Sequence, residues 1–424
     1  MEQKRYEALG ETVFHTVLEN GLHIYVDPRP DYSKQFAFFC THYGGMNMRF
    51  REQGGDWQDT PAGVAHFLEH KMFDTKDGNA LQILAANGAN PNAFTASSIT
   101  GYFFSSTGKF EENLRTLLGF VSQPWFTPES VDKEQGIIGQ EIRMGDDDPN
   151  IEVFYGLMKC LYAHNPIRES IAGTVESIAE ITADTLYSCH KAFYNPQNMV
   201  LWVAGSAGPE QVAAVAREVL PQTAEPAVET DFGPEEEPRV YEPLREKEMA
   251  VSAPLFQVGF KGEPPRTGEQ QRRQLLGSLV CDVLVGPSSP LYTRLYEEGL
   301  INNSFEAGYE SEPGCAFLIM GGESRQPEKV RDAILAEAAR AAREGLDEGL
   351  WERQKKARYG SMVRKLNSLE DLCIEGAQAH FSGEDFLEFP ALFRRVTKEE
   401  AEDMIRRWIT PERTALSVIR PKEG

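Results

Sequence analysis

The sequence predicts a protein of two similar domains, each mixing β-strands with α-helices. Three observations lead to this fold class: the length, an acidic proline-rich segment near the middle, and a similar order of elements on both sides of it. The chain has 424 residues, and at roughly 100–200 residues per domain two or three domains are expected. Hydrophobic residues make up 41% and charged residues 25%, an ordinary composition for a folded globular protein.

Residues 221–248 form the clearest boundary in the sequence. This segment is rich in proline and carries nine acidic against three basic residues, so it contributes −6 of the net charge of −22. Low hydrophobicity, prolines and like charge prevent a packed core, which predicts an extended linker. The expected organisation is therefore an N-terminal domain at 1–220 and a C-terminal domain at 249–424.

The N-terminal half shows strand and helix patterns in alternation. Alternating or short continuous apolar runs predict strands, and apolar residues at helical spacing predict helices. The predicted strands are residues 22–30, 35–45, 92–98, 100–107 and 199–206. The predicted helices are residues 110–123 and 209–220, besides one that begins at Pro61.

The C-terminal half repeats this order of elements. A strand at 253–262 is followed by a helix at 271–284 and by two strands at 302–310 and 315–324. Two helices then follow, at 327–345 and 346–366. The shared order suggests a duplicated unit, and the absence of a repeat of 20–50 residues excludes a solenoid.

Charge and cysteine content exclude several classes of function. A net charge of −22 speaks against nucleic acid or an anionic membrane as the main partner. The six scattered cysteines include no Cys-x-x-Cys pair, which argues against a disulfide framework or a cysteine zinc site. No run reaches the ~18 apolar residues of a membrane span, so a cytoplasmic protein is expected.

The most informative motif is HFLEH at residues 66–70. Thr60 followed by Pro61 predicts a helix start, and the helix is expected to run to about Asp74. His66 and His70 are four residues apart, so two imidazoles on one helix face can bind the same metal ion. Glu69 lies at the edge of that face, where it can act as a general base toward water at the metal. The arrangement His-x-x-Glu-His is the inverted zincin motif. The alternative is two exposed histidines and a solvated glutamate.

A second predicted helix offers the remaining ligand. It opens at Thr127-Pro128 and ends near Gly145, and its residues Glu134 and Glu141 are seven apart, hence on one face. We assign Glu141 as the third zinc ligand and Glu134 as a carboxylate that supports a ligand imidazole. Gly136 and Gly139 disfavour a helix by about 1 kcal/mol each, which suggests close approach of another helix or a site. The alternative is two glutamates on a solvated face.

These residues resemble a known family of zinc peptidases. HFLEH followed 71 residues later (141 − 70) by the glutamate of GQEIRM is similar to the pattern of pitrilysin, insulysin and mitochondrial processing peptidase. Further similar stretches are residues 89–106, 171–178, 193–206 and 286–300, and the length resembles the small two-domain bacterial processing-protease branch.

The resemblance implies an α+β fold. Each of two homologous domains would be a mainly antiparallel sheet with helices packed on one face, and the chain would form half of a clam-shell chamber. It also implies one Zn²⁺ per chain held by His66, His70 and Glu141, with Glu69 as general base and Glu134 supporting the site. The implied activity is that of a zinc-dependent endopeptidase acting on peptides or unfolded segments.

The segment Asn92, Ala93, Phe94 and Thr95 is a candidate for substrate binding. Its alternation predicts a strand, and in the family the matching strand is an open sheet edge that pairs with the substrate backbone. Such pairing is largely indifferent to side chains and suits peptides of varied sequence. The alternative is an ordinary core strand.

The sequence departs from the family pattern in its second half. Active relatives carry an arginine and a tyrosine that bind the substrate carbonyl and the developing oxyanion, but the matching positions here hold Tyr296 and Asn302. Arg294 is two residues out of register, so it would point to another side of its helix. Losing such donors costs ~3–4 kcal/mol per group. We therefore expect a heterodimer with a paralogous chain that supplies this pair, although a homodimer is possible.

Two other functions are compatible with the sequence. A catalytically silent homologue could serve as a peptide-binding or assembly subunit, which the missing pair favours and the five metal-site residues disfavour. A metallohydrolase acting on a non-peptide bond needs the same site but leaves the resemblance unexplained. The other six histidines have no partner at ligand spacing and are expected to be packed or on the surface.

Overall fold

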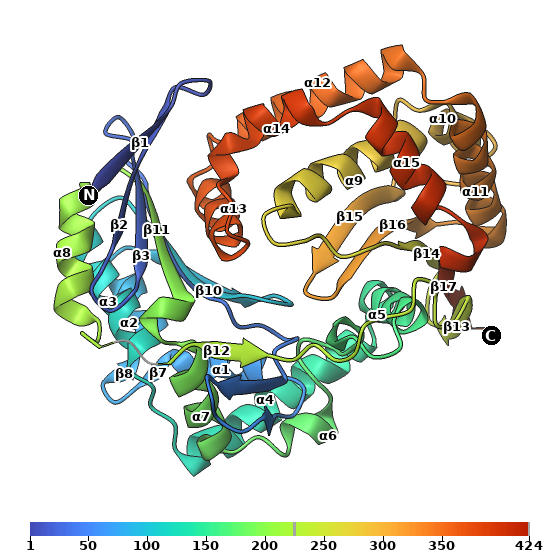
Figure 1. Ribbon diagram of the computed structural model, residues 1–424. Helices are drawn as coiled ribbons and strands as arrows, with labels where there is room; N and C mark the ends of the chain where they lie inside the picture. The colour runs from blue at the N-terminus through green and yellow to red at the C-terminus, as the bar shows by residue number, and fades with distance from the viewer. Residues whose placement is uncertain (224–225, 423–424) are drawn as a thin grey trace. The chain divides into compact units, whose positions relative to one another are not determined.

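The predicted α+β fold is confirmed by the computed structural model, which describes residues 1–223 and 226–422. The chain forms two compact units. The first comprises Met1–Ile142, Glu169–Phe232 and Val363–Glu388, and the second Arg143–Arg168, Gly233–Met362 and Phe389–Gly424. Each unit is built around one mainly antiparallel sheet (Figure 1).

The first unit contains a seven-stranded sheet in the order β1-β2-β3-β11-β4-β10-β9. All neighbouring strands are antiparallel except β3 and β11. The strands are β1 (Glu2–Tyr6), β2 (Glu11–Val17), β3 (His23–Pro28), β4 (Gln35–Thr41), β9 (Asn90–Thr95), β10 (Thr100–Ser106) and β11 (Met199–Gly205). Strand β9 pairs only with β10 and is therefore an edge of the sheet.

The second unit contains a five-stranded sheet in the order β13-β17-β14-β16-β15. Its strands are β13 (Leu244–Met249), β14 (Leu255–Lys261), β15 (Glu306–Glu312), β16 (Cys315–Glu323) and β17 (Thr414–Pro421). This order matches β3-β11-β4-β10-β9 strand for strand, and in both sheets only the first pair is parallel. The shared topology supports the duplication that the element order predicts.

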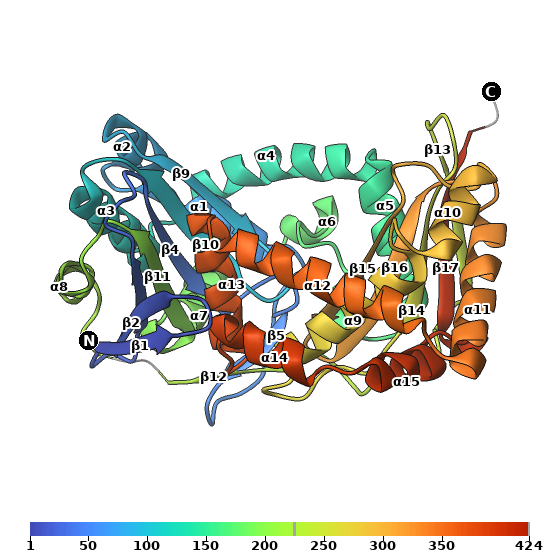
Figure 2. The same ribbon diagram turned by 90° about the horizontal axis from the view of Figure 1, so that it is seen from above.

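The helices of the first unit cover mainly one face of its sheet. The apolar core there joins residues of β3, β4, β10 and β11 to α1, α3, α7 and α8. The helices are α1 (Val64–Met72), α2 (Ala80–Ala86), α3 (Phe110–Ser122), α4 (Pro128–Asp146), α6 (Val175–Ile178), α7 (Ala183–Phe193), α8 (Pro209–Val219) and α13 (Leu369–Phe381). Figures 1 and 2 show α13 on the face opposite α3 and α8.

In the second unit α9 and α15 lie on one face of the sheet and α5 on the other (Figure 1). The helices of this unit are α5 (Pro149–Leu161), α9 (Gln270–Val285), α10 (Pro290–Glu297), α11 (Pro327–Glu344), α14 (Phe389–Arg395) and α15 (Lys398–Trp408), and α12 (Glu348–Lys365) ends in the first unit. Short strands complete the structure: β5 (Arg49–Glu52), β6 (Gln58–Asp59) and β12 (Val228–Thr230), and the pair β7 (Asp74–Thr75) and β8 (Gly78–Asn79).

Each unit takes one helix from the other half of the sequence. Helix α13 packs on the first sheet, where a Cβ at Gly376 would lie 2.6 Å from atoms of the Trp202 ring. Helix α5 packs on the second sheet, where a Cβ at Gly259 would lie 2.9 Å from a methyl group of Leu157. Glycine thus permits close approach at both places. The predicted boundaries at 1–220, 221–248 and 249–424 divide the chain into consecutive segments. In the structure, residues 143–168 of the N-terminal half belong to the second unit, and residues 363–388 of the C-terminal half belong to the first.

The predicted linker at 221–248 contains two strands. In the first unit β12 pairs with β5, and in the second β13 runs parallel to β17. Between them Glu236 anchors the chain to the second unit, because its carboxylate accepts hydrogen bonds from the backbone N–H groups of 163–165 and from Lys261. A composition that cannot build its own core therefore adds strands to the sheets of its neighbours.

Most predicted elements appear within a few residues of their expected bounds, but the first helix begins later. Helix α1 starts at Val64, not at Pro61, and Gly63 precedes it with a φ of 99°. The hydroxyl of Thr60 does not cap the helix and donates to the carbonyl oxygen of Met48 (3.1 Å). Among the described residues no single helix is long and apolar enough to cross a membrane, although α9 and α10 together pass this test across a bend of 46°.

Candidate metal centre

Helix α1 presents two histidines because its other side is buried in the core. Four residues of α1 are at most 2% exposed and pack in the core of the first unit: Val64, Phe67, Leu68 and Met72. His66 and His70 lie on the remaining side, with side chains 12% and 27% exposed. The local sequence thus fixes which face of α1 can hold a ligand.

The start of α1 is positioned by the loop at residues 171–173. A Cβ at Gly63 would lie 2.6 Å from the carbonyl oxygen of Ala172, and one at Gly173 would lie 2.4 Å from that of Ala62. Both glycines have positive φ angles, 99° and 75°, which residues other than glycine rarely adopt. The hydroxyl of Ser177 also donates to Ala62 (2.8 Å). These contacts place the stretch at 171–178 against the start of the helix that carries the histidine motif.

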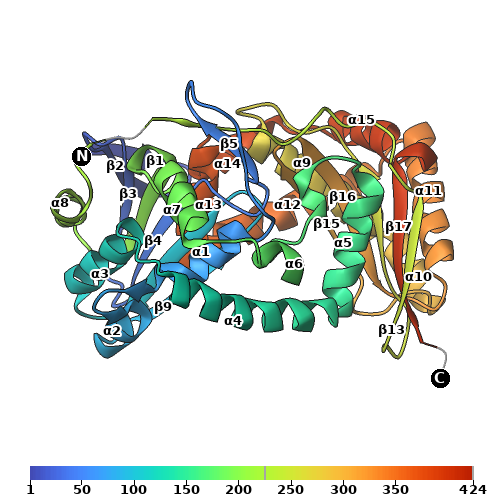
Figure 3. The same ribbon diagram turned by 90° about the horizontal axis from the view of Figure 1, so that it is seen from below.

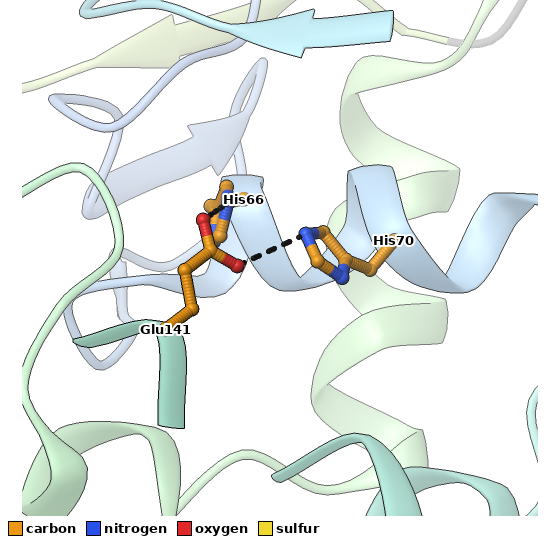
Figure 4. Close-up of side chains that lie close together, drawn as sticks. All are labelled: His66, His70 and Glu141. Carbon is orange, nitrogen blue, oxygen red and sulfur yellow. Dashed lines mark ion pairs between the residues drawn. The ribbon is translucent and has the colours of Figure 1, made fainter. Parts of the chain in front are cut away.

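Glu141 of helix α4 reaches both histidines, as predicted. Its Oε1 lies 3.4 Å from Nε2 of His66 and its Oε2 lies 3.5 Å from Nε2 of His70 (Figure 4). Figure 3 shows α4 passing beside α1 in this unit. Among the described residues these three form the one cluster of histidine, cysteine or carboxylate donors whose atoms all lie within 4.8 Å of one another.

The donor geometry fits zinc. Tetrahedral zinc with bonds of about 2.0–2.1 Å to nitrogen and oxygen holds its donors about 3.3–3.4 Å apart, close to the two separations here. A direct charged hydrogen bond would be shorter, about 2.7–2.9 Å. Two imidazoles and one carboxylate also form a typical catalytic zinc site with one position left open.

Glu134 orients one of the two histidines. Its Oε1 lies 3.1 Å from Nδ1 of His70, and because a carboxylate only accepts, Nδ1 carries the proton. In the neutral ring the lone pair is then on Nε2, which faces Glu141. The lone pair on Nε2 of His70 and the carboxylate of Glu141 are both acceptors. A cation, either a proton or a metal ion, is therefore required between them. Among the described residues the buried Nδ1 of His66 has no hydrogen-bond partner, so only His70 is held in this way.

Electrostatics in the cluster favours a cation. The hydrogen bond to Glu134 raises the pKa of His70 against the opposing effect of burial, and the charges of Glu141 and Glu69 raise it further. The hydrogen bond with His66 lowers the pKa of Glu141, again against burial. The carboxylates around His70 therefore stabilise positive charge at this site.

Glu69 lies beside the ligands and is held by a strand end. The hydroxyl of Thr95, the last residue of β9, donates to Oε2 of Glu69 at 2.7 Å. The side chain is partly exposed, so water can reach it. A carboxylate in this position can move a proton next to the donor cluster.

The predicted substrate-binding residues lie on the edge strand β9. Asn92 to Thr95 pair on one side with Phe103 to Thr100 of β10 and have no strand on the other side among the described residues. Phe94 faces away from the core cluster, with its ring 5.9 Å from that of Phe38. Ala93 packs against the core on the opposite face. The expectation of an open edge is met, and its use in substrate binding stays a prediction.

The two glycines inside α4 differ in their surroundings. A Cβ at Gly136 would meet nothing within 4 Å, so the expected close approach at that glycine is wrong, whereas Gly139 is buried.

Of the other histidines, His15 and His23 lie 3.1 Å apart between Nε2 and Nδ1, and the ring of His380 packs against that of His23. Burial lowers the pKa of His380 to about 4, and the nearby histidines add to this effect. They are packed side chains, as expected.

The positions expected to hold the arginine and tyrosine pair lie in the second unit. Tyr296 is 48% exposed on α10 and stacks on Tyr292 with ring centroids 6.1 Å apart. The Asn302 amide donates to Glu323 (2.9 Å). Neither side chain carries a positive charge. Lys71, to which no sequence motif points, is buried next to Glu134 and pairs with Asp74.

Comparison with known proteins identifies the family of this chain. Two family profiles match: "Insulinase (Peptidase family M16)" over residues 53–175 and "Peptidase M16 inactive domain" over residues 180–358. YmfH of Bacillus subtilis strain 168, described as an uncharacterized zinc protease, is 36% identical over 423 residues, with 98% of each chain covered. The chain belongs to peptidase family M16, the insulinase family.

Solved structures of the M16 family and beyond show the same fold. A putative M16-like peptidase from Alicyclobacillus acidocaldarius has a TM-score of 0.93 at 32% identity, covering 98% of this chain and 99% of that chain. Pitrilysin has a TM-score of 0.77 at 15% identity, covering 99% of this chain but 46% of that chain. The second likeness concerns the fold alone. Among relatives by sequence, SCO5738 of Streptomyces coelicolor is also described as an uncharacterized zinc protease and is 24% identical, covering 97% of this chain and 90% of that protein.

Proposed function

We propose that the protein is a zinc-dependent endopeptidase that hydrolyses peptides or unfolded segments. The observation that carries this proposal is the convergence of His66, His70 and Glu141 on one point, with Glu69 beside them. Zinc bound by these three residues would polarise a scissile carbonyl and lower the pKa of a water molecule. The names of the relatives as zinc proteases support the choice of metal and of reaction.

Glu69 is the proposed general base. Its carboxylate takes a proton from the attacking water and later passes it to the leaving amine. Thr95 holds one oxygen of this carboxylate, which leaves the other to accept the proton. Because Thr95 ends the edge strand β9, a peptide that pairs with Asn92–Thr95 would run toward the base. Backbone pairing would then align substrates of different sequence.

A paralogous partner is part of the proposal. Tyr296 and Asn302 cannot supply the charge and the phenol of the family pair, and the loss of oxyanion donors costs ~3–4 kcal/mol each. A heterodimer in which the second chain contributes these groups would restore them, and a homodimer would not. In support, this fold spans 46% of the pitrilysin chain and 48% of the chain of PqqL from Escherichia coli, so longer chains have room for two such halves. The enclosed chamber also remains a prediction.

Metal analysis of three purified proteins tests the site. Wild type should contain one zinc per chain and His70→Ala none, while Glu69→Gln should retain zinc but lose activity by a factor of about 10²–10⁴, the typical contribution of a general base. Equal zinc content in wild type and His70→Ala would contradict the proposal. So would full peptidase activity of Glu69→Gln.

Mixing experiments test the partner. The purified chain alone should cleave an unstructured peptide poorly, and addition of a paralogue that carries the arginine and tyrosine should raise the rate by two orders of magnitude or more, because about 1.4 kcal/mol corresponds to a factor of ten. A paralogue with both residues replaced by alanine is the control. High activity of the isolated chain would remove the reason for a partner.

The second candidate is a catalytically silent peptide-binding or assembly subunit. It is favoured by Tyr296 and Asn302 and by the match to the inactive-domain profile at 180–358. A silent subunit has no need of a metal site, so the absence of a zinc difference between wild type and His70→Ala would favour it. Zinc binding together with activity in any tested assembly would exclude it.

A further inference from the structure

A buried lysine follows the second histidine of the motif. The side chain of Lys71 is 1% exposed and belongs to the buried side of the nine-residue helix α1. Lysine is almost never buried to this degree unless its ammonium group is paired. Its partners therefore indicate what the charge does.

The ammonium group of Lys71 lies between two carboxylates. Its Nζ is 2.5 Å from Oδ2 of Asp74 and 3.9 Å from Oε2 of Glu134. The other oxygen of Glu134, Oε1, is the one that lies 3.1 Å from Nδ1 of His70. The two oxygens of Glu134 thus face two different partners, a cation on one side and a metal-ligand imidazole on the other.

This arrangement constrains Glu134. Its side chain is 14% exposed, so water can solvate the carboxylate only in part, and a nearby cation offsets the cost of burial. With Oε2 attracted toward Lys71, Oε1 stays directed at His70. Asp74, 45% exposed, accepts one hydrogen bond from the ammonium group, and Glu134 is the second carboxylate within 4 Å of it.

We propose that Lys71 is a positioning residue for the metal ligand His70, acting through Glu134. The lysine holds the Glu134 carboxylate in the orientation that accepts the Nδ1 proton, and this leaves Nε2 of His70 free to bind the metal. The inference rests on the metal site proposed above. It extends the support of His70 outward by one residue that belongs to the same helix as the ligand.

A double-mutant cycle on zinc affinity tests the inference. Competition with a chromophoric chelator gives the affinity of wild type, Lys71→Met, Glu134→Gln and the double variant, and urea unfolding of the metal-free proteins confirms that each is folded. Removing a group that orients a ligand typically weakens metal binding about 10–100-fold, which we expect for Glu134→Gln. For Lys71→Met, one step further out, we expect a loss of about 3–10-fold. The double variant should equal Glu134→Gln.

Two further variants separate the roles of the ion pairs. Lys71→Arg keeps the charge, and its zinc affinity should stay within about threefold of that of wild type. A difference of this size is close to the error with which the effects of separate substitutions add. Asp74→Asn removes the other partner of Lys71 and should leave zinc affinity unchanged. If Lys71→Met does not fold, Lys71→Gln, which keeps a polar group but no charge, takes its place in the cycle.

The outcomes distinguish this inference from the proposed function. Wild type that binds no zinc would overturn both. Wild type that binds one zinc while Lys71→Met binds it equally well would overturn only the role of Lys71. Two other results would overturn the role of Lys71. In the first, Lys71→Met lowers zinc affinity as much in the Glu134→Gln background as in wild type. In the second, Asp74→Asn lowers zinc affinity as much as Lys71→Met does.

Discussion

The Thr95 hydroxyl connects the base to the strand proposed to bind substrate. It donates to Glu69 at 2.7 Å, while its backbone pairs with Thr100 of β10. At the residue scale, the site therefore combines three supports: Thr95 for the proposed base Glu69, Glu134 for the candidate ligand His70, and the packed face of α1 for both histidines. A charged acceptor strengthens a hydrogen bond to about 1.5–3 kcal/mol, so each polar support is worth testing alone.

Thr95→Val removes the hydroxyl and keeps the shape of the side chain. We expect kcat for peptide cleavage to fall about tenfold, equivalent to about 1.4 kcal/mol, because Glu69 loses the contact that orients it. Zinc content should not change, since Thr95 touches none of the ligands. Steady-state kinetics with metal analysis measures both, and Thr95→Ser, which keeps the hydroxyl, is the matched control. Wild-type kcat in Thr95→Val would show that the bond does not serve catalysis.

At the scale of elements, one helix of each unit comes from the other half of the chain. Helix α13 lies across β11 and β4 on the face that the other helices of this unit leave open, and Gly376 brings it against Trp202. A hydrogen bond holds the segment before it: Arg29, which is ion-paired with Asp27 (2.9 Å), donates to the carbonyl oxygen of Leu366 (2.7 Å). The packing of α13 thus depends on a glycine that the helical pattern alone disfavours.

Gly376→Ala should destabilise the protein, whereas Gly360→Ala should not. A Cβ at Gly376 would lie 2.6 Å from Trp202, and a Cβ at Gly360 in α12 would meet nothing within 4 Å. Overpacking of a core typically costs about 1–3 kcal/mol, while an unobstructed helical alanine stabilises by up to about 1 kcal/mol. Urea unfolding followed by tryptophan fluorescence compares the two. A midpoint of Gly376→Ala at or above that of Gly360→Ala would contradict this packing argument.

At the scale of the whole molecule, the acidic segment between the halves is anchored to the second unit at Glu236. Burial alone would raise the pKa of Glu236, but the backbone N–H groups of 163–165 and the ammonium of Lys261 lower it to about 2. This carboxylate lies in the second unit together with all of these partners. Its ionised form therefore stabilises the connection of residues 233–243 to that unit.

Glu236→Gln should lower the free energy of unfolding at neutral pH and make that free energy depend less on pH in the acidic range. Because the folded pKa is depressed to about 2, the stabilisation is fully present above the ordinary glutamate pKa of about 4.3 and is lost as pH falls toward 2. We expect a loss of about 2 kcal/mol at pH 7, reduced for partial solvent screening, and a smaller difference from wild type at pH 3. Thermal unfolding at both pH values measures this. Equal differences at pH 7 and pH 3 would contradict it, and Glu235→Gln next to it is the control.

Local pattern was sufficient for most strands and helices of this chain. The run from Phe36 to Thr41 is buried throughout and reads as a strand because it is short and apolar on both faces. The start of α1 was misplaced because its determinants are distant: Thr60 bonds to Met48, and Gly63 packs against Ala172. The buried Lys71 gave no pattern signal either, since a lysine is expected to be exposed. Its role depends on Glu134, which lies 63 positions further along the chain (134 − 71).

The sequence by itself determined two halves with a similar order of strands and helices and a pair of histidines on one helix face, because apolar periodicity and four-residue spacing are properties of a single helix or strand. Glu141 was assigned from its place on a second helix and matches the family motif, and the structure brings it to the two imidazoles. Only the tertiary structure decided which helix covers the second face of each sheet, and which side chains hold the ligands and the base. Such contacts join residues far apart in the chain, and no local periodicity records them.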